Sequence, residues 1–236
     1  MLLHLDEALL AVVKPSGVTV IPARDEPPER SLRHQLERER GEKLWVVHRL
    51  DRDTSGVVVF ARSAEAHRRL SMAFESRAVE KRYLAWTRGR PPAASGLVAT
   101  PLHPARKGKM RPALAGEEGA LASETAYETL STFDSALGPL SRVAASPHTG
   151  RQHQIRVHLR ALGAPLLVDP LYGRCERVDA GALGPGSPEV RRLTLHAERL
   201  TLVHPLSNER LTLVAPLPDD LAALDAWLEA QPHSER

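Results

Sequence analysis

Residues 46–60 read Val-Val-His-Arg-Leu-Asp-Arg-Asp-Thr-Ser-Gly-Val-Val-Val-Phe, and the other expectations for this chain start from this stretch. Both of its ends are apolar and rich in β-branched residues, which is typical of strands buried against a core. The middle, residues 48–55, is almost entirely polar, charged or small. The pattern predicts two core strands that hold a polar loop between them, where a fold can present a reactive group on a rigid base.

The loop places Asp51 between Arg49 and Arg52, with Thr54 following. For any one of these residues, a turn capped by the aspartate with solvated arginines is the simpler interpretation. A plain turn, however, needs neither two arginines nor a run of carboxylate and hydroxyl side chains. The loop as a whole therefore indicates a functional site.

His-Arg-Leu-Asp-Arg-Asp-Thr-Ser-Gly at 48–56 resembles the signature loop of the RluA-type pseudouridine synthases, in which the aspartate of the His-Arg-Leu-Asp segment is catalytic. The resemblance implies that the protein isomerises a uridine within RNA, rRNA or tRNA, with Asp51 as the catalytic carboxylate. Thr-Gly-Arg-Gln-His-Gln-Ile-Arg at 149–156 resembles the second family signature, whose final arginine, here Arg156, pairs with that carboxylate. The Lys-Arg-Tyr segment ending at Tyr83 resembles a third, whose tyrosine packs on the target base near the sugar.

The remaining expected contacts involve the RNA backbone and the target base. Lys14, in a Lys-Pro-Ser-Gly segment that the family also carries, is a candidate for a phosphate contact or for a place directly behind the catalytic loop. Residues 103–112 hold four Lys/Arg with Gly and Pro, which predicts a flexible basic loop that becomes ordered on phosphate, although a merely solvated loop is nearly as good an interpretation. Leu167 is a candidate apolar floor for the base. The other expected substrate contacts are Arg49, Arg52, Thr54, Arg151 and His153.

Pseudouridine formation breaks the N1–C1′ bond and rejoins the ring through C5, and it involves no redox step and no external group. We therefore expect no cofactor. Free aspartate titrates near ~3.9, so Asp51 would be ionised at neutral pH and needs positioning and protection from water more than activation. Asp51 would either attack the sugar or base or promote elimination at the sugar. Tyr83 would stack on the uracil and could exchange a proton near C2′.

Two other functional classes compete with the synthase. A non-catalytic RNA-binding domain of the same fold predicts the loss of Asp51, Tyr83 or Arg156, and all three are present. An RNA N-glycosidase or a histidine-dependent nuclease would release free uracil or cleave the strand. A metal site is not expected, because His148, His153 and His158 recur at intervals of five, and such positions diverge by ~140° on a helix.

Composition sets the broad class. The 236 residues, 42% of them hydrophobic, can bury a real core, and neither a signal peptide nor a membrane span is evident. The single cysteine, Cys175, cannot form an internal disulfide, so a reducing cytoplasm is expected. Net charge is +3, but residues 217–236 carry −4 and the rest +7, which suits a polyanion such as RNA. Aromatic residues at 4% argue against extensive base stacking.

Periodicity predicts the elements and the fold class. We expect a single α+β catalytic domain over residues 1–236 with a mixed, mainly antiparallel sheet flanked by helices and loops, and with a central cleft. The catalytic pattern begins so near Met1 that no separate N-terminal RNA-binding domain is expected, and the protein is expected to be a monomer. The expected strands are 9–13, 79–86, 124–130, 141–145 and a hairpin of 193–204 with 210–215, and the expected helices are 31–40, 63–77, a helix that ends at Gly163 and a last helix after Pro218.

Overall fold

The stretch at 46–60 forms the predicted strand–loop–strand in the computed structural model of the chain, which describes residues 1–23, 26–173 and 175–231. The first strand is short, β3 (Trp45–Val46), and the second is β4 (Ser55–Ala61), in which every residue is buried. Burial on both faces explains why β4 is a continuous apolar run and not an alternating one. The polar loop lies between the two strands, as the sequence predicts.

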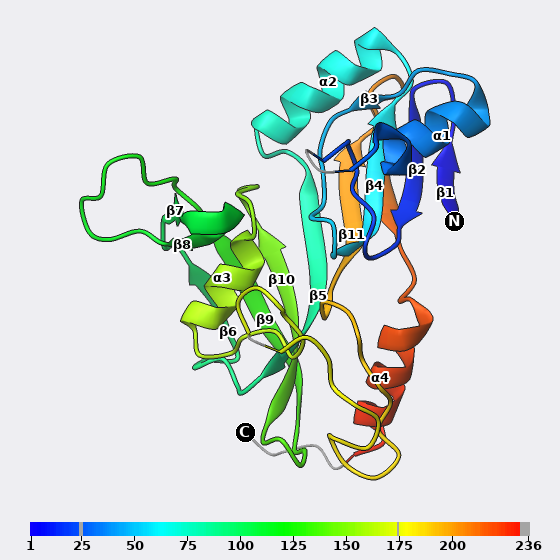
Figure 1. Cartoon of the computed structure of the whole chain (residues 1–236). Helices are drawn as coiled ribbons and strands as arrows, with labels where there is room; N and C mark the ends of the chain where they lie inside the picture. Colours follow the sequence, from blue (N-terminus) through cyan, green and yellow to red (C-terminus); the bar gives the residue numbers. More distant parts are fainter. Residues whose placement is uncertain (24–25, 174, 232–236) are drawn as a thin grey trace. The chain divides into compact units, whose positions relative to one another are not determined.

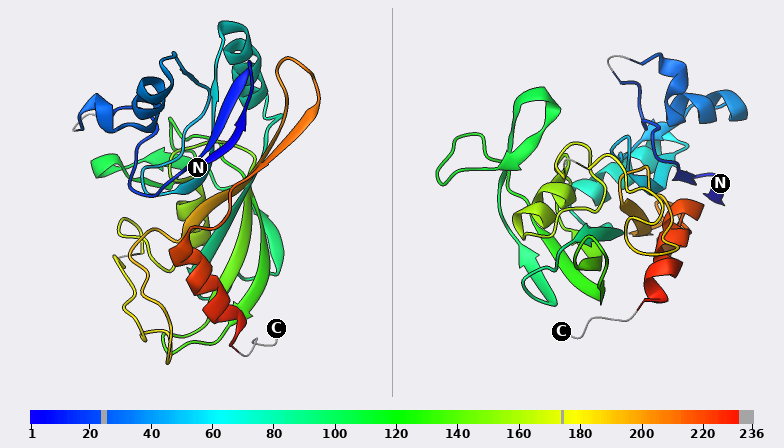
Figure 2. Two further views of the ribbon diagram at one scale, coloured as in Figure 1. Left: turned by 90° about the vertical axis from the view of Figure 1, so that its right-hand side faces the viewer. Right: turned by 60° about the horizontal axis from the view of Figure 1, so that its bottom comes forward.

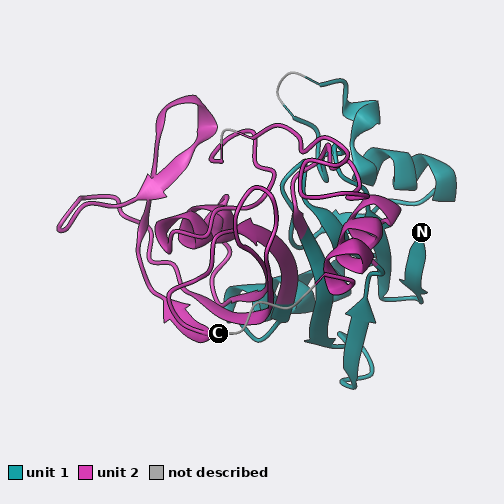
Figure 3. Cartoon of the chain, turned by 90° about the horizontal axis from the view of Figure 1, so that it is seen from below, with its two compact units in different colours: residues 1–81, 196–216 teal, residues 82–195, 217–236 magenta. Residues whose placement is uncertain are grey.

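Figure 1 labels the helices and strands along the chain, and Figure 3 colours the two compact units into which the chain divides. Unit 1 comprises Met1–Lys81 and His196–Pro216, and unit 2 comprises Arg82–Leu195 and Leu217–Arg236. The chain therefore passes from one unit to the other after residues 81, 195 and 216. Each unit has its own core.

In unit 1, β4 is the central strand. It pairs along its length with β2 (Leu9–Lys14), and β2 pairs with β1 (Leu2–Leu5). The other edge of β4 pairs with β3 at one end and with β11 (Leu195–Val203) at the other, and β11 forms a hairpin with β12 (Arg210–Val214). Of these pairings only β4–β11 is parallel. The helices of this unit are α1 (Leu32–Arg40), α2 (Ala64–Glu75) and the short 3-10 helix η1 (Pro28–Arg30).

The core of unit 1 lies between this sheet and α2. Val57 and Val59 of β4 pack with Ala66 and Leu70 of α2, all of them fully or almost fully buried. Helix α2 begins where the sequence predicts, because the side chain of Ser63 accepts the N–H of Ala66 at 3.1 Å. The polar loop before β4 is thus anchored on a packed layer.

In unit 2 an antiparallel sheet runs in the order β5 (Glu80–Arg88), β10 (Leu140–Pro147), β9 (Thr125–Phe133) and β6 (Ser95–Val98). Helix α3 (Gln154–Ala161) packs Ile155 and Leu159 into one core cluster, and Gly163, at φ +79°, follows its end as predicted. Helix α4 (Asp219–Glu229) buries its three leucines in a second cluster. The expectation of an α+β fold with a mixed, mainly antiparallel sheet is confirmed.

The basic segment 103–112 was expected to be a flexible loop, and that expectation is wrong. It forms most of a two-stranded antiparallel hairpin, β7 (Leu102–Pro104) and β8 (Met110–Pro112), joined by the 3-10 turn η2 (Arg106–Gly108). This hairpin, the basic arm, stands out from the main sheet of unit 2 (Figure 2). In the described part of the chain, no helix has the length and apolar character needed to cross a membrane.

Candidate active site

The loop that carries Asp51 is pinned by backbone contacts. The N–H of Thr54 donates to the carbonyl of Asp51 at 3.2 Å and closes a turn. The N–H of Gly17 donates to the carbonyl of Arg52, and the hydroxyl of Ser16 donates to the carbonyl of Asp53, at 2.9 and 2.7 Å. The turn that ends β2 therefore holds the residues directly after Asp51, whose own side chain is half-buried.

Lys14 lies beneath this turn and is fully buried. Its ammonium group donates to the carbonyls of Pro15, Val18 and Arg52 at 2.8, 2.7 and 2.7 Å. An ammonium has three N–H donors, so it can bind these three carbonyls at once. Of the two roles expected for Lys14, a place behind the catalytic loop fits this geometry and a phosphate contact does not.

A second buried pair supports the start of β4. The Ser55 hydroxyl lies 2.7 Å from Nδ1 of His196, whose Nε2 lies 3.2 Å from the carbonyl of Ala215. Because the carbonyl can only accept, the imidazole donates to it from Nε2, and in the neutral ring Nδ1 then accepts from the Ser55 hydroxyl. Beside it, a Cβ on Gly56 would lie 2.2 Å from the carbonyl oxygen of Ala197, and Gly56 has φ +127°. Only glycine fits there, which explains the Ser-Gly that closes the signature.

His48 is a supporting residue that the sequence interpretation assigned no role. Its Nε2 accepts the backbone N–H of Val59 at 3.0 Å, and its ring stacks on Phe74 of α2 with 4.6 Å between centroids. Burial, with the positive charge of Lys81 nearby, lowers the pKa of His48 to about 3. A neutral His48 therefore ties the chain just before Asp51 to β4 and α2.

The other expected contacts in this loop have different exposures. Arg49 and Arg52 are exposed, and Arg52 forms an ion pair with Glu26 at 3.1 Å. Thr54 is buried. The exposed arginines suit contacts with RNA phosphates, whereas Thr54 belongs to the framework of the turn.

In unit 2, Arg156 is buried on α3 and bound bidentately by Asp169. Its Nε and Nη2 donate to the two carboxylate oxygens at 2.9 and 2.7 Å. The same carboxylate accepts the backbone N–H groups of Leu171 and Tyr172 at 2.9 and 3.0 Å, and the guanidinium lies over the ring of Tyr172, with Cζ 5.0 Å from the centroid. The sequence interpretation missed Asp169 as a partner of Arg156.

Tyr83 and Leu167 belong to different clusters of unit 2. Tyr83 on β5 is half-buried and packs against the cluster that contains Ile155 and Leu166. Leu167 is fully buried in the cluster that α4 covers. An apolar floor beside the tyrosine is therefore better placed at Leu166 than at Leu167.

Arg151 and His153 lie just before α3. Arg151 is exposed and donates from Nε to the carbonyl of Ala122 at 3.1 Å. His153 is half-buried, adopts φ +55° at the N-terminus of the helix, and places Nδ1 2.8 Å from the hydroxyl of Tyr172. A non-glycine residue in this backbone region is uncommon, and the tyrosine contact helps to hold it.

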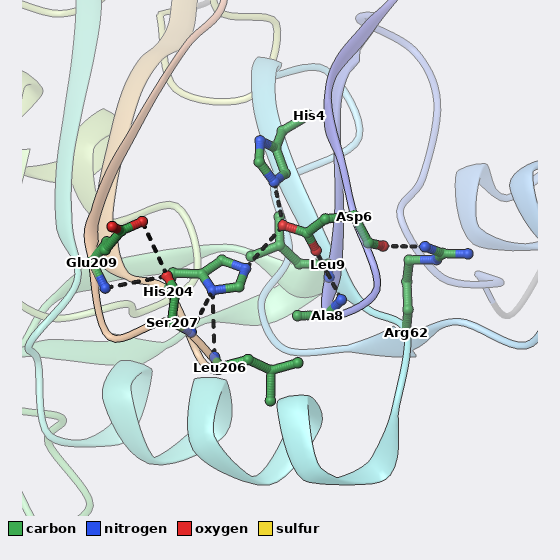
Figure 4. Close-up of polar contacts among 9 residues, drawn as sticks. All are labelled: His4, Asp6, Ala8, Leu9, Arg62, His204, Leu206, Ser207 and Glu209. Atoms are coloured by element: carbon green, nitrogen blue, oxygen red, sulfur yellow. Dashed lines mark hydrogen bonds and ion pairs between the residues drawn. The ribbon is translucent and has the colours of Figure 1, made fainter.

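Among the described residues, one group could hold a metal ion by composition: His4, Asp6 and His204. Both histidines place Nε2 against the same carboxylate oxygen of Asp6, at 2.5 and 2.9 Å (Figure 4). Nδ1 of His204 accepts the N–H of Ser207 at 3.0 Å, so the proton of the neutral ring is on Nε2 and is directed at Asp6. A metal ligand would need the opposite tautomer. These hydrogen bonds form a clasp, in which His4 and His204 bind Asp6 and so connect the turn after β1 to the turn after β11. The geometry fits this structural role better than a metal site.

The charge of Asp6 is well stabilised in this clasp. Burial acts to raise the pKa of Asp6, but the hydrogen bonds from His4 and from the N–H groups of Leu9 and Ala8, together with His204, outweigh it and lower the pKa to about 2. Asp6 therefore stays ionised at any ordinary pH, and it accepts from both histidines.

Comparison with known proteins decides the family. A family model described as RNA pseudouridylate synthase matches residues 8–161, a range that contains the loop of Asp51. The dual-specificity RNA pseudouridine synthase RluA of Escherichia coli (strain K12) is 38% identical over 204 residues, which cover 86% of this chain and 87% of that protein. The chain belongs to the RNA pseudouridylate synthase family. It is an isomerase that converts uridine in RNA to pseudouridine.

Other relatives agree with this pseudouridylate synthase assignment. The ribosomal large subunit pseudouridine synthase D of Nitrosomonas europaea is 34% identical over 235 residues, which cover 97% of this chain and 65% of that protein. Among solved structures, human RNA pseudouridylate synthase domain containing 4 matches with a TM-score of 0.73 and 28% identity, covering 97% of this chain and 92% of that one. The similarity thus extends over almost the whole chain in both sequence and fold.

Proposed function

We propose that Asp51 is the catalytic carboxylate of this pseudouridine synthase, that Arg156 stabilises its charge and that Tyr83 stacks on the target uracil. The observation that carries the proposal is the fixed position of the turn after Asp51. Lys14, fully buried, holds the carbonyl of Arg52 at 2.7 Å, and Gly17 donates to the same oxygen. A catalytic carboxylate needs this kind of support, because a small displacement of the reacting group costs much of the rate.

The reaction balances without any co-reactant. The N1–C1′ bond breaks, a C5–C1′ bond forms, the proton leaves C5 and N1 gains one. Asp51 would act either by attack at C1′ or at the base, or by promoting elimination at the sugar, with Tyr83 exchanging a proton near C2′ in the second case. Both routes need a site that excludes water, because water at an activated C1′ would give free uracil.

Contacts with the RNA backbone would come from exposed cations. Arg49, Arg52 and Arg151 carry exposed guanidinium groups in the sequence signatures, and the basic arm adds four more positive charges. Guanidinium groups bind phosphate oxygens bidentately. These contacts would offset the few kcal/mol needed to take the target uridine out of its stack. His153 would add a hydrogen bond at the start of α3.

We propose rRNA, tRNA or both as the substrate, and a monomeric enzyme that acts in the cytoplasm. The names of the relatives, one a dual-specificity RNA pseudouridine synthase and one a ribosomal large subunit pseudouridine synthase, support a structured RNA of this kind. Mapping pseudouridines in the RNA of cells with and without this protein tests the substrate. Sedimentation of the purified protein with and without RNA tests the monomer.

The test of the catalytic role compares two aspartates of one turn. Asp51→Asn should abolish tritium release from C5-labelled uridine in RNA and leave RNA binding within about twofold. Asp53→Asn is the matched control, because Asp53 lies two residues along with its side chain 48% exposed, and it should keep activity. Wild-type turnover by Asp51→Asn would refute the assignment, and release of free uracil by the wild-type enzyme would identify a glycosidase instead.

A further inference from the structure

Tyr172 of unit 2 lies between the basic arm and the helix that carries Arg156. It is only 7% exposed. Its hydroxyl oxygen accepts the backbone N–H of Met110, the first residue of β8, at 2.7 Å. The same oxygen lies 2.8 Å from Nδ1 of His153 at the start of α3. A single hydroxyl thus joins the arm to the helix.

One of the two hydrogen bonds has a defined direction, because the Met110 N–H can only donate and the tyrosine oxygen therefore accepts it. The second joins the same oxygen to Nδ1 of His153. The rings of Tyr172 and His153 also pack edge to face, with 5.5 Å between their centroids.

Tyr172 also contacts the Arg156 site in two ways. Its ring lies beneath the guanidinium, and its backbone N–H donates to Oδ1 of Asp169 at 3.0 Å, the oxygen that binds Nη2 of Arg156. A shift of Tyr172 would therefore move both groups that hold Arg156.

The arm has further contacts on the same side. Lys109 donates to the carbonyl of Leu171 at 3.2 Å, and the Gln152 side chain donates to the carbonyl of Gly108 at 3.4 Å. The arm is thus connected to the segment 171–172 and to the residues before α3, so a ligand that fixes the arm also restrains these positions.

We propose that Tyr172 is a positioning residue that couples the occupancy of the basic arm to the placement of Arg156. RNA phosphates that bind Arg106 and Lys107 would hold β8 in place. The Met110 N–H would then hold the hydroxyl of Tyr172, and Tyr172 would hold Arg156. This rests on the proposed function, in which the arm meets RNA and Arg156 supports the catalytic carboxylate.

The first test is Tyr172→Phe, which removes the hydroxyl and keeps the ring under Arg156. The single-turnover rate at saturating RNA should fall about tenfold, because the free energy that one hydrogen bond contributes corresponds roughly to a tenfold change in rate. The Kd for RNA should change less than about twofold, because the variant keeps every cation. Tyr127→Phe is the matched control, since Tyr127 is equally buried in the same unit, on β9, and it should keep the rate.

The second test is a double-mutant cycle with Arg106→Ala/Lys107→Ala. In the wild-type background this arm variant should weaken binding and also lower the saturated single-turnover rate. In the Tyr172→Phe background it should weaken binding by the same factor and lower the rate no further. If Tyr172 contributed only to the stability of the fold, the arm variant would lower the rate by the same factor in both backgrounds.

Three results separate the possible failures. A wild-type rate for Tyr172→Phe would overturn the inference, and so would fully additive rate losses in the cycle. Wild-type activity of Arg156→Lys would instead overturn the proposed role of Arg156, on which the inference depends.

Discussion

Lys14 is a charged side chain whose function follows from where its donors point. A fully buried ammonium is costly unless it is well hydrogen-bonded, and here three carbonyls accept from it. One of them belongs to Arg52, next to Asp51. The buried charge therefore fixes the conformation of the loop that carries Asp51.

Replacing Lys14 should distinguish this structural role from a phosphate contact. Lys14→Met keeps much of the length of the side chain and leaves buried carbonyls without their donor, so the free energy of unfolding should fall by about 2–4 kcal/mol. Urea unfolding measures this, and RNA binding at a temperature where the variant is folded should stay close to wild type. Unchanged stability with weakened, less salt-dependent binding would restore the phosphate-contact role.

His48 should make the stability of the protein depend on pH in a defined window. Its pKa is about 3 in the folded protein and near ~6.5 in an unfolded chain, so between these values the unfolded state binds more protons. The contribution of His48 is present above pH ~6.5 and is lost as pH falls, by up to about 1.4 kcal/mol per pH unit.

His48→Gln isolates that contribution, because glutamine can accept the Val59 N–H and does not titrate. Unfolding free energies measured from pH ~7 to ~4 should therefore fall less steeply in the variant than in the wild type. Parallel curves for the two proteins would show that His48 does not titrate with this depressed pKa.

At the scale of elements, local signals predicted most of the structure. The Ser63 cap, the continuous apolar run of β4 and the leucines spaced along α4 each specify their element through neighbouring residues, and the structure contains all three elements. Periodicity and capping are local properties, so one sequence carries them fully.

The elements and pairings that sequence reasoning missed depend on distant residues. The basic arm lacks an apolar alternation, and it is held by contacts such as the N–H of Met110 to the hydroxyl of Tyr172, 62 positions apart. The pairing of Arg156 with Asp169 and of Ser55 with His196 likewise joins different elements. Nothing local in the chain signals these partners. The family resemblance could supply residue identities and proposed roles, but not this geometry.

At low salt, removing charge from the basic arm should change the affinity for RNA more than it changes the rate of the chemical step. Arg106→Ala/Lys107→Ala should weaken binding and reduce the slope of log K against log salt by about one for each phosphate that the arm no longer binds. Arg177→Ala/Arg191→Ala removes the same charge from exposed positions of the same unit and is the matched control. Equal slopes for the two variants would mean that the arm makes no specific phosphate contact.

At the scale of the whole molecule, each unit is assembled from two separate stretches of chain, which pass between the units after residues 81, 195 and 216. Neither unit can therefore be cut out as one continuous segment. The cores of the two units are separate: the core of unit 1 joins β4 to α2, and one core cluster of unit 2 contains the leucines of α4. We expect these cores to unfold together as a single catalytic domain.

Leu224→Ala tests this expectation, because Leu224 is fully buried in unit 2 and the cavity should cost about 2–5 kcal/mol. Hydrogen exchange read by mass spectrometry should then show equal losses of protection in β10 of unit 2 and in β4 of unit 1. Val59→Ala, fully buried in unit 1, is the mirror variant and should have the same effect on both strands. If each variant loosens only its own unit, the chain folds as two domains, and the support of the Asp51 loop would then depend on unit 1 alone.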